Sequence, residues 1–296
     1  MYEALRRPDE DVIELRRRRV HLWRWPGRNP QPIVLLHGWM DTGQTFQFLV
    51  DALSSQYTLL APDLRGFGRT ERAGEGYWFP QYLADLDALL RHIAPDAPVT
   101  LIGHSMGGNI ANLYGGARPE RVERLIALEG FGLPRTTPDM APARYREWLD
   151  QLERDSGLLS YPDWATFTNV LARRNPRVPR DRVEFVARAW ADEQPDGRIV
   201  LRADPDHKRI NPMLYRRDEA EACWAAITAP VLWLLGEHSE YLGRVAEDVA
   251  EPRLKRLYRD VDVRTIAGVG HMLHWERPDL VAREIERFVA GEAVRS

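Results

Sequence analysis

The stretch Val99-Thr-Leu-Ile-Gly-His-Ser-Met-Gly-Gly108 decides the fold, because an apolar run typical of a buried strand leads directly into the pattern Gly-x-Ser-x-Gly. Such a turn from a strand into a helix holds its central residue in a strained backbone conformation. The flanking glycines leave room for the helix to pack closely. The hydroxyl of Ser105 would then stand exposed above the sheet. We interpret Ser105 as a candidate nucleophile; the alternative is a glycine-rich turn with an incidental serine.

Apolar runs and amphipathic stretches alternate on both sides of this turn. The alternation predicts an α/β fold with a mostly parallel sheet and helices on both faces. Residues 12–25 predict an antiparallel hairpin at the edge of the sheet, with the arginines of 16–19 guarding that edge against pairing. The further strands are expected at 33–36, 57–61, 124–129, 231–235 and 261–266, and the helices at 83–90, 110–118 and 278–290.

The pattern changes after Gly130, where a proline-containing linker precedes three amphipathic stretches. Their apolar faces, which we interpret mostly as packing faces, carry Tyr145, Trp148, Leu149 and Leu152; Trp164, Phe167, Val170 and Leu171; and Val183, Val186 and Trp190. We therefore expect two units. A core is formed by residues 1–132 and 227–296, and a helical cap, or lid, by residues 133–226.

Composition excludes several classes of protein. The 296 residues carry a net charge of -3, which gives no general attraction to nucleic acid or to anionic membranes. Cys223 is the one cysteine, so a disulfide within the chain and a multi-cysteine zinc site are excluded. The start carries no apolar leader and no stretch is long enough to span a bilayer, so we expect a cytoplasmic protein. Residues 204–207 are interpreted as a turn, and no metal or cofactor is expected.

Four segments, in this order, resemble the α/β-hydrolase superfamily, in its lid-bearing, esterase-like serine hydrolase branch. They are His37-Gly38 after one strand, Asp63-Leu-Arg-Gly-Phe-Gly68 after the next, Gly103 to Gly108, and Gly270-His271 after the last strand. One Gly-x-Ser-x-Gly pattern is weak evidence, whereas four matched segments at plausible spacing are strong evidence.

The resemblance implies roles for particular residues. A serine hydroxyl needs a base within hydrogen-bond reach, and His271 occupies the family position of that base, with His274 as its competitor. The backbone N–H groups of Trp39 and Met106 would form the oxyanion hole. His37 is interpreted as a packed structural histidine. Many lid-bearing relatives have proline where this chain has Met40. The chain therefore departs from the family pattern in this loop, and the shape of the loop is left open.

The acid of the triad is expected at Glu129. Most of the superfamily carries this acid as aspartate in a Gly-x-x-Asp pattern after the later strand, but this chain has Ser239 at that place. Glu129 directly follows a predicted strand, in a position resembling the alternative acid site of some haloalkane dehalogenases and lipases. Glu240 is the alternative acid, and a surface glutamate that opens the lid linker is the alternative interpretation of Glu129.

We therefore predict a serine hydrolase that forms an acyl-enzyme, with a small apolar carboxylic ester as its substrate. A carbon–carbon bond hydrolase and an aminopeptidase would use the same three roles. A non-catalytic small-molecule receptor on the same fold is the alternative from another class. Dehalogenase and epoxide hydrolase interpretations fail, because those relatives carry aspartate where Ser105 stands. The expected partner is the small apolar acyl substrate, with no nucleic acid and no membrane. The sequence makes no prediction of oligomeric state.

Overall fold

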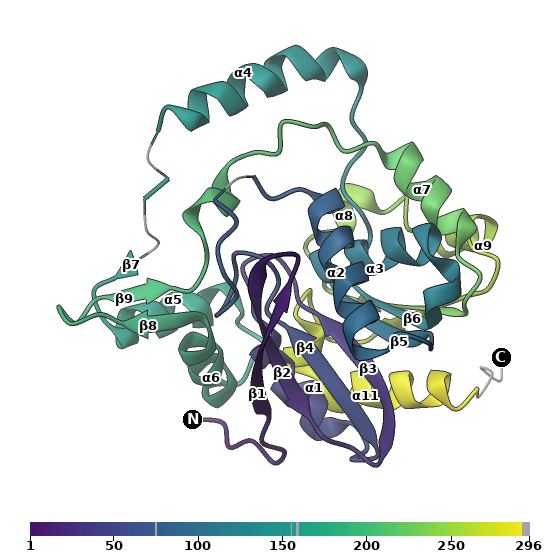
Figure 1. The fold of residues 1–296 in the computed structure, drawn as a ribbon, viewed down its shortest axis with the longest axis horizontal. Coiled ribbons are helices and arrows are strands. Elements are labelled where there is room, and N and C mark those ends of the chain that lie inside the picture. Colours follow the sequence, from purple (N-terminus) through teal and green to yellow (C-terminus); the bar gives the residue numbers. More distant parts are fainter. Residues whose placement is uncertain (75, 155, 158–159, 292–296) are drawn as a thin grey trace.

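One eight-stranded sheet dominates the computed structural model, which describes residues 1–74, 76–154, 156–157 and 160–291 (Figure 1). The strand order is β1-β2-β4-β3-β5-β6-β10-β11. The first hairpin is antiparallel and β2 pairs antiparallel with β4, whereas all other neighbours are parallel, which confirms the predicted α/β fold. The strands are β1 (Asp9–Leu15), β2 (Arg18–Trp25), β3 (Asn29–Leu36), β4 (Tyr57–Pro62), β5 (Val99–His104), β6 (Val122–Leu128), β10 (Val231–Gly236) and β11 (Val261–Ile266).

Helices cover both faces of this sheet. Consecutive side chains of a strand point to opposite faces, so Val34 and Leu36 pack on one face and Ile33 and Leu35 on the other. The first face is covered by α2 (Phe79–Ile93), α3 (Met106–Ala117) and α7 (Arg217–Ala226), and the second by α1 (Gln47–Ala52) and α11 (Pro278–Val289). The short elements η1 (Gly43–Phe46), η2 (Pro119–Arg121), α8 (Leu242–Val245), α9 (Glu251–Leu257) and α10 (Leu273–Glu276) complete this part.

The arginines of the first hairpin correct one interpretation. Arg16 and Arg17 form the turn between β1 and β2, with φ of 51° and 61°. Two consecutive positive φ angles match the right-handed twist of a hairpin. The Arg16 guanidinium lies 2.8 Å from the Asp85 carboxylate of α2. The edge strand is β1, so the arginine run builds the turn and the start of an inner strand and does not guard the edge.

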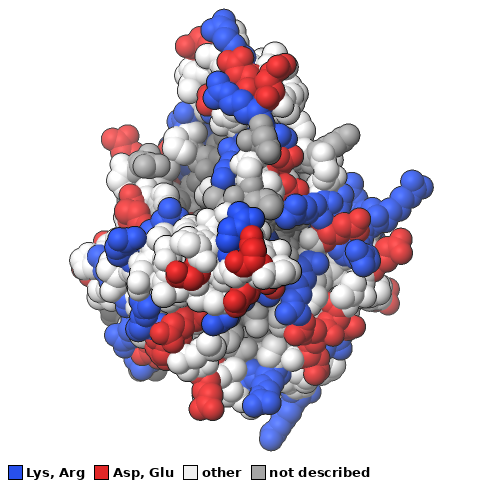
Figure 2. Space-filling model, turned by 90° about the vertical axis from the view of Figure 1, so that its left-hand side faces the viewer, with Lys and Arg blue, Asp and Glu red and all other residues white. Residues whose placement is uncertain are grey.

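The chain between β6 and β10 folds beside the main sheet. It contains η3 (Pro138–Met140), α4 (Ala141–Leu152), α5 (Trp164–Arg174), α6 (Arg180–Trp190) and η4 (Pro205–Lys208). A small antiparallel sheet adds β7 (Ser160–Tyr161), β9 (Ile199–Leu201) and β8 (Ala191–Glu193), in that spatial order. Helices α5 and α6 pack in a buried cluster that also takes in Phe48 and Trp275 from the main part. Over the face that carries this small sheet, acidic and basic side chains are interspersed (Figure 2).

Helix α4 differs from the other two predicted cap helices. It lies away from the main sheet, at the top of Figure 1, and none of its residues is buried. Tyr145, Leu149 and Leu152 are exposed by 45%, 54% and 46%, and Trp148 is half-buried, so the prediction that this face packs was wrong for three of its four residues. Its apolar stripe has the correct helical period. The segment 210–213 contacts the helix, with the Ile210 N–H donating to Gln151 Oε1 over 2.8 Å, but it leaves most of the stripe exposed.

Helix α7 lies inside the range expected for the cap but packs with the main sheet. Trp224 is fully buried against Trp233 of β10, with ring centroids 5.7 Å apart. We therefore propose that the cap comprises residues 133–216 and that α7 belongs to the core. None of the helices among the described residues is both long and apolar enough to cross a membrane.

Candidate active site

Ser105 stands at the junction between β5 and α3, in the strained conformation that the sequence predicted, with φ 50° and ψ −112°. Close backbone contacts explain the glycines around it. A Cβ on Gly103 would lie 2.3 Å from the Gly107 carbonyl oxygen, and a Cβ on Gly107 would lie 2.0 Å from that of Leu36. The Ser105 N–H donates to the Leu128 carbonyl over 2.8 Å, which anchors the turn to the end of β6. The tight packing around the turn therefore holds the strained residue in place.

His271 and Glu129 meet at the same end of the sheet. The Nδ1 atom of His271 lies 3.0 Å from Oε2 of Glu129, although the residues are 142 positions apart. Glu129 is 1% exposed and has a positive φ of 56°, which turns the chain sharply at the end of β6. The ring of Tyr241 lies against His271, with centroids 4.4 Å apart. A buried carboxylate in this place can accept the Nδ1–H and fix the tautomer whose Nε2 lone pair is free.

Glu129 is held by two further donors. Its Oε1 accepts the Gly236 N–H over 2.7 Å, and its Oε2 accepts the hydroxyl of Ser239. Ser239 is the residue at the family's usual acid position, so in this chain that position supplies a donor to the carboxylate. The alternative acid, Glu240, is exposed. The structure therefore brings Glu129, and not Glu240, to His271.

His274, the competitor for the role of base, lies fully buried against the rings of Phe46 and His104, at centroid distances of 5.3 and 4.3 Å. Burial and the neighbouring His271 lower the pKa of His274 to about 3. It remains neutral at physiological pH. His271, in contrast, lines the same cavity as Ser105.

The expected oxyanion donors lie on the two loops that border Ser105. Met106 is the first residue of α3, so its N–H has no acceptor within the helix. Trp39 follows Gly38, whose missing Cβ would lie 3.4 Å from that of Ser105. Met40 has a φ of 60°, an angle that proline cannot adopt, so the departure from the family's proline has a backbone reason.

His37 braces this loop, as the structural interpretation predicted. Its Nε2 accepts the Leu64 N–H and its Nδ1 donates to the Gly38 carbonyl, each over 2.8 Å. Burial lowers the pKa of His37 to about 4, so the ring stays neutral with one donor and one acceptor. The two loops that follow β3 and β4 are thereby tied together.

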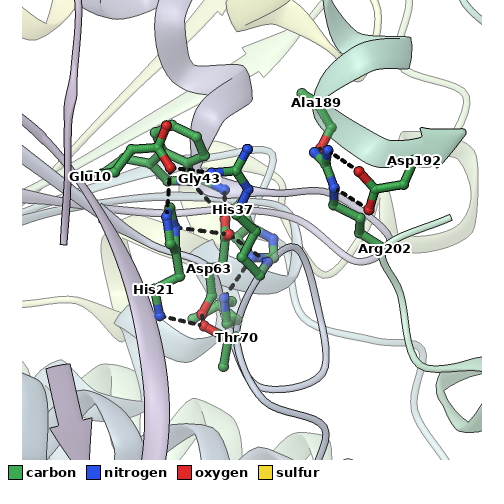
Figure 3. Close-up of polar contacts among 12 residues, drawn as sticks. Glu10, His21, His37, Gly43, Asp63, Thr70, Ala189, Asp192 and Arg202 are labelled. Atoms are coloured by element: carbon green, nitrogen blue, oxygen red, sulfur yellow. Dashed lines mark hydrogen bonds and ion pairs between the residues drawn. The ribbon is translucent and has the colours of Figure 1, made fainter. Parts of the chain in front are cut away.

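The Asp63 carboxylate makes a second brace (Figure 3). It accepts the N–H groups of Gly43 and Arg69 over 2.8 and 2.9 Å and the indole N–H of Trp23 over 3.1 Å, and Nδ1 of His21 lies 3.3 Å away. Burial opposes ionisation of Asp63, but the hydrogen bonds from His21 and Arg69 outweigh it and lower its pKa. This anion therefore ties Gly43, which follows the loop of Trp39, to Trp23 of β2 and to the loop after β4.

A cavity of about 530 Å³ lies over Ser105 and is lined by His271 and Glu129. Its wall is mostly apolar and includes Trp190, which comes from the range predicted for the cap. Most of the other lining residues were not assigned from the sequence, and Asp41 and Tyr241 are two of them. Asp41 lies in the loop after β3 and Tyr241 in the loop after β10, and no sequence motif assigns a role to either residue. The remaining lining residues include Trp39, Tyr77, Phe79, Phe131, Leu133, Met272, Trp275, Asn109, Asn175, Arg209 and Asn211.

Comparison with known proteins shows the family of this chain. A family model described as the alpha/beta hydrolase family matches residues 33–284. A serine hydrolase-like protein of Danio rerio is 26% identical over 277 residues, covering 91% of this chain and 84% of the relative. The esterase YbfF of Escherichia coli is 26% identical over 266 residues, covering 88% and 94%. A thioesterase domain from the curacin biosynthetic pathway superposes with a TM-score of 0.80 at 25% identity, covering 94% of this chain and 99% of the domain. The chain belongs to the alpha/beta hydrolase family and is a hydrolase.

Proposed function

We propose that this protein is a serine hydrolase that cleaves small apolar carboxylic esters through an acyl-enzyme. The observation that carries the proposal is the pair of His271 Nδ1 and Glu129 Oε2 at 3.0 Å, in a cavity that Ser105 also lines. A buried carboxylate, a histidine it orients and a serine in a strained turn are the three groups that acyl transfer requires. The relatives named above are called hydrolases and esterases, which agrees with this chemistry.

In the proposed reaction, the Ser105 oxygen attacks the ester carbonyl carbon while His271 Nε2 takes the hydroxyl proton. Glu129 stabilises the imidazolium that forms. The carbonyl oxygen becomes an oxyanion, which the backbone N–H groups of Trp39 and Met106 receive. His271 then gives its proton to the leaving alcohol, and the ester bond breaks. A water molecule, activated in the same way, releases the acid and restores Ser105.

The size and wall of the cavity support the substrate class. A volume of about 530 Å³ lies within the usual range for small-molecule sites. The aromatic side chains around Ser105, among them Trp39, Phe131 and Tyr241, favour burial of an apolar acyl group.

A labelling experiment with a substrate series tests the proposal. We expect a fluorophosphonate probe to modify Ser105, and p-nitrophenyl esters of short acyl chains to be hydrolysed with a single optimum of chain length. The Ser105→Ala variant is the matched control and should give neither result. Labelling of Ser105 without ester turnover would favour a carbon–carbon bond hydrolase or an aminopeptidase. The absence of labelling would contradict a nucleophilic serine.

A further inference from the structure

Next to the proposed triad, three buried side chains come together that the reaction does not use. One carboxylate oxygen of Asp41, one ring nitrogen of His104 and one of His274 all lie within 4.8 Å of one another. The three residues are 3%, 2% and 0% exposed. They come from the loop after β3, the end of β5 and helix α10, so only the fold brings them together.

Each of these residues presents an atom without a partner. Oδ2 of Asp41, Nδ1 of His104 and both ring nitrogens of His274 are buried and accept or donate no hydrogen bond within the described residues. A buried polar atom without a partner costs about 1–3 kcal/mol. Such atoms gathered at one point indicate that a further group satisfies them.

The other atoms of two of these residues are arranged as in metal ligands. A ligating histidine usually donates its second ring N–H to a carbonyl or carboxylate. The His104 Nε2 lies 3.0 Å from the His271 carbonyl oxygen, which makes it the donor and leaves a lone pair on Nδ1. The Oδ1 of Asp41 accepts three donors, from Thr42, Thr45 and Trp190, at 2.7–2.8 Å, which leaves Oδ2 for a ligand.

Space and access are also present. Asp41 and His104 line the cavity above Ser105, so an ion can enter from there. Gly38 keeps the approach to His104 open, because a Cβ at that position would lie 2.9 Å from Nδ1. A tetrahedral zinc ion with bonds of about 2.0–2.1 Å needs ligand atoms roughly 3.3 Å apart. The side chains would therefore close by up to about 1.5 Å, which torsions of the histidine rings and of Asp41 can supply.

We propose that Asp41, His104 and His274 form a site for a divalent first-row transition metal ion, with Zn²⁺ as the best match. Two imidazoles and one carboxylate are ligands that suit such ions, and the cavity leaves a position for water. The sequence predicted no metal, because these three ligands lie on segments that are far apart along the chain. The site goes beyond the proposed function and its presence does not depend on it.

The effect on catalysis does rest on the proposed function. His104 donates to the carbonyl of His271, so a bound ion places two positive charges close to the base. A cation there opposes formation of the imidazolium during attack. Saturating Zn²⁺ should therefore lower kcat by about ten-fold or more, and EDTA should restore it.

Metal binding is measured first, by titration calorimetry with Zn²⁺ and by metal analysis after gel filtration of the full chain. We expect one ion per chain in the wild type. His274→Phe keeps an aromatic ring in the stack and removes a ligand. Asp41→Asn keeps an oxygen for the three donors and removes the charge. Both variants should lose the ion at concentrations that saturate the wild type, while His92→Phe, a change on the exposed face of α2, should keep it.

The outcomes separate the alternatives. Binding that survives in both His274→Phe and Asp41→Asn would place the ion elsewhere, such as on His271 and Glu129, and would overturn the site. The absence of stoichiometric binding in the wild type would also overturn it. Thermal melting of each variant shows whether it is folded, and fluorophosphonate labelling of the His274→Phe variant shows whether Ser105 is still reactive. If the fluorophosphonate probe does not label Ser105 in the wild type, this counts against the proposed function alone, because metal binding measured by calorimetry does not require catalysis.

Discussion

Replacing Glu129 by glutamine tests the proposed triad most sharply. The carboxylate accepts the Gly236 N–H on Oε1, and the His271 ring and the Ser239 hydroxyl on Oε2. Glutamine has only one oxygen to offer. If that oxygen keeps the bond to Gly236, whose backbone is fixed in β10, the amide NH₂ faces His271. The histidine must then accept on Nδ1 and carry its proton on Nε2, where it cannot take the Ser105 proton.

The alternative orientation of the amide is costly. It would place the NH₂ group against the Gly236 N–H and leave a buried backbone donor unpaired, at about 1–3 kcal/mol. Even in that orientation the side chain carries no charge to stabilise the imidazolium. We therefore expect kcat to fall by about two orders of magnitude or more, which corresponds to a barrier about 2.7 kcal/mol higher. The change is nearly isosteric, so the melting temperature should fall by only a few degrees.

The assay is steady-state hydrolysis of the best nitrophenyl ester, with Glu240→Gln as the matched control. Glu240 is exposed, so its variant should keep kcat within about two-fold. A crippled Glu240→Gln enzyme beside a nearly normal Glu129→Gln enzyme would refute the reasoning.

A second variant turns the same reasoning into a gain of function. The Ser239 hydroxyl already touches the Glu129 carboxylate at the oxygen that faces His271. An aspartate at 239 can therefore reach Nδ1, while the glutamine amide at position 129 gives its oxygen to Gly236 and its NH₂ to the new carboxylate. Glu129→Gln/Ser239→Asp should recover at least ten-fold of the lost kcat. Ser239→Asp alone should lower activity, because two carboxylates would share one histidine.

Three further outcomes are expected. Ser105→Ala should lower turnover on the order of 10³-fold or more with an unchanged melting temperature, and full activity would end the proposal of a serine nucleophile. Trp190→Phe removes a 2.8 Å bond to Asp41 and should lower the melting temperature by about 2–4 °C in differential scanning fluorimetry, so an equal temperature would show that this bond adds nothing. Burial opposes ionisation of Glu221, but hydrogen bonds from three arginines outweigh it and lower its pKa below 4.5. The stabilisation is therefore fully present above pH 4.5 and is lost as the pH falls through the folded pKa. The stability gap between wild type and Glu221→Gln should be widest near neutral pH and close on acidification, whereas a constant gap would exclude this ionisation as its cause.

The local patterns of the sequence predicted the fold well, because each depends on neighbours along the chain. The buried strands appeared as short apolar runs, and the glycines around Ser105 predicted a turn that the φ of 50° confirms. The apolar period of residues 141–152 correctly predicted a helix. It could not show that the helix would stand clear of the core, since a hydrophobic stripe does not identify the surface that covers it.

The groups around the site could be predicted only where a motif marked them. Asp41 and Tyr241 line the cavity through contacts across the fold, and the cluster of Asp41, His104 and His274 joins three distant segments. The family comparison also left the loop at Met40 open. The positive φ of Met40 is a backbone property that cannot be predicted from its side chain.

The position of Glu129 follows from the register of two strands. Strands β6 and β10 are parallel neighbours, with Leu128 beside Leu234, and the Glu129 N–H donates to the Leu234 carbonyl over 3.0 Å. Strand β10 continues two residues further, to Gly236, whose N–H donates to Glu129. The ends of the two strands therefore lie side by side, and a side chain leaving either end can reach the same point on the loop that carries His271. A carboxylate at the end of β6 needs a sharp turn to face that point, which the φ of 56° at Glu129 provides. A carboxylate after β10 would be placed instead by the loop that carries Ser239. The chemistry of the histidine asks only for an anion at Nδ1, so the fold permits the acid to stand on either strand, and a serine can occupy the place that is left.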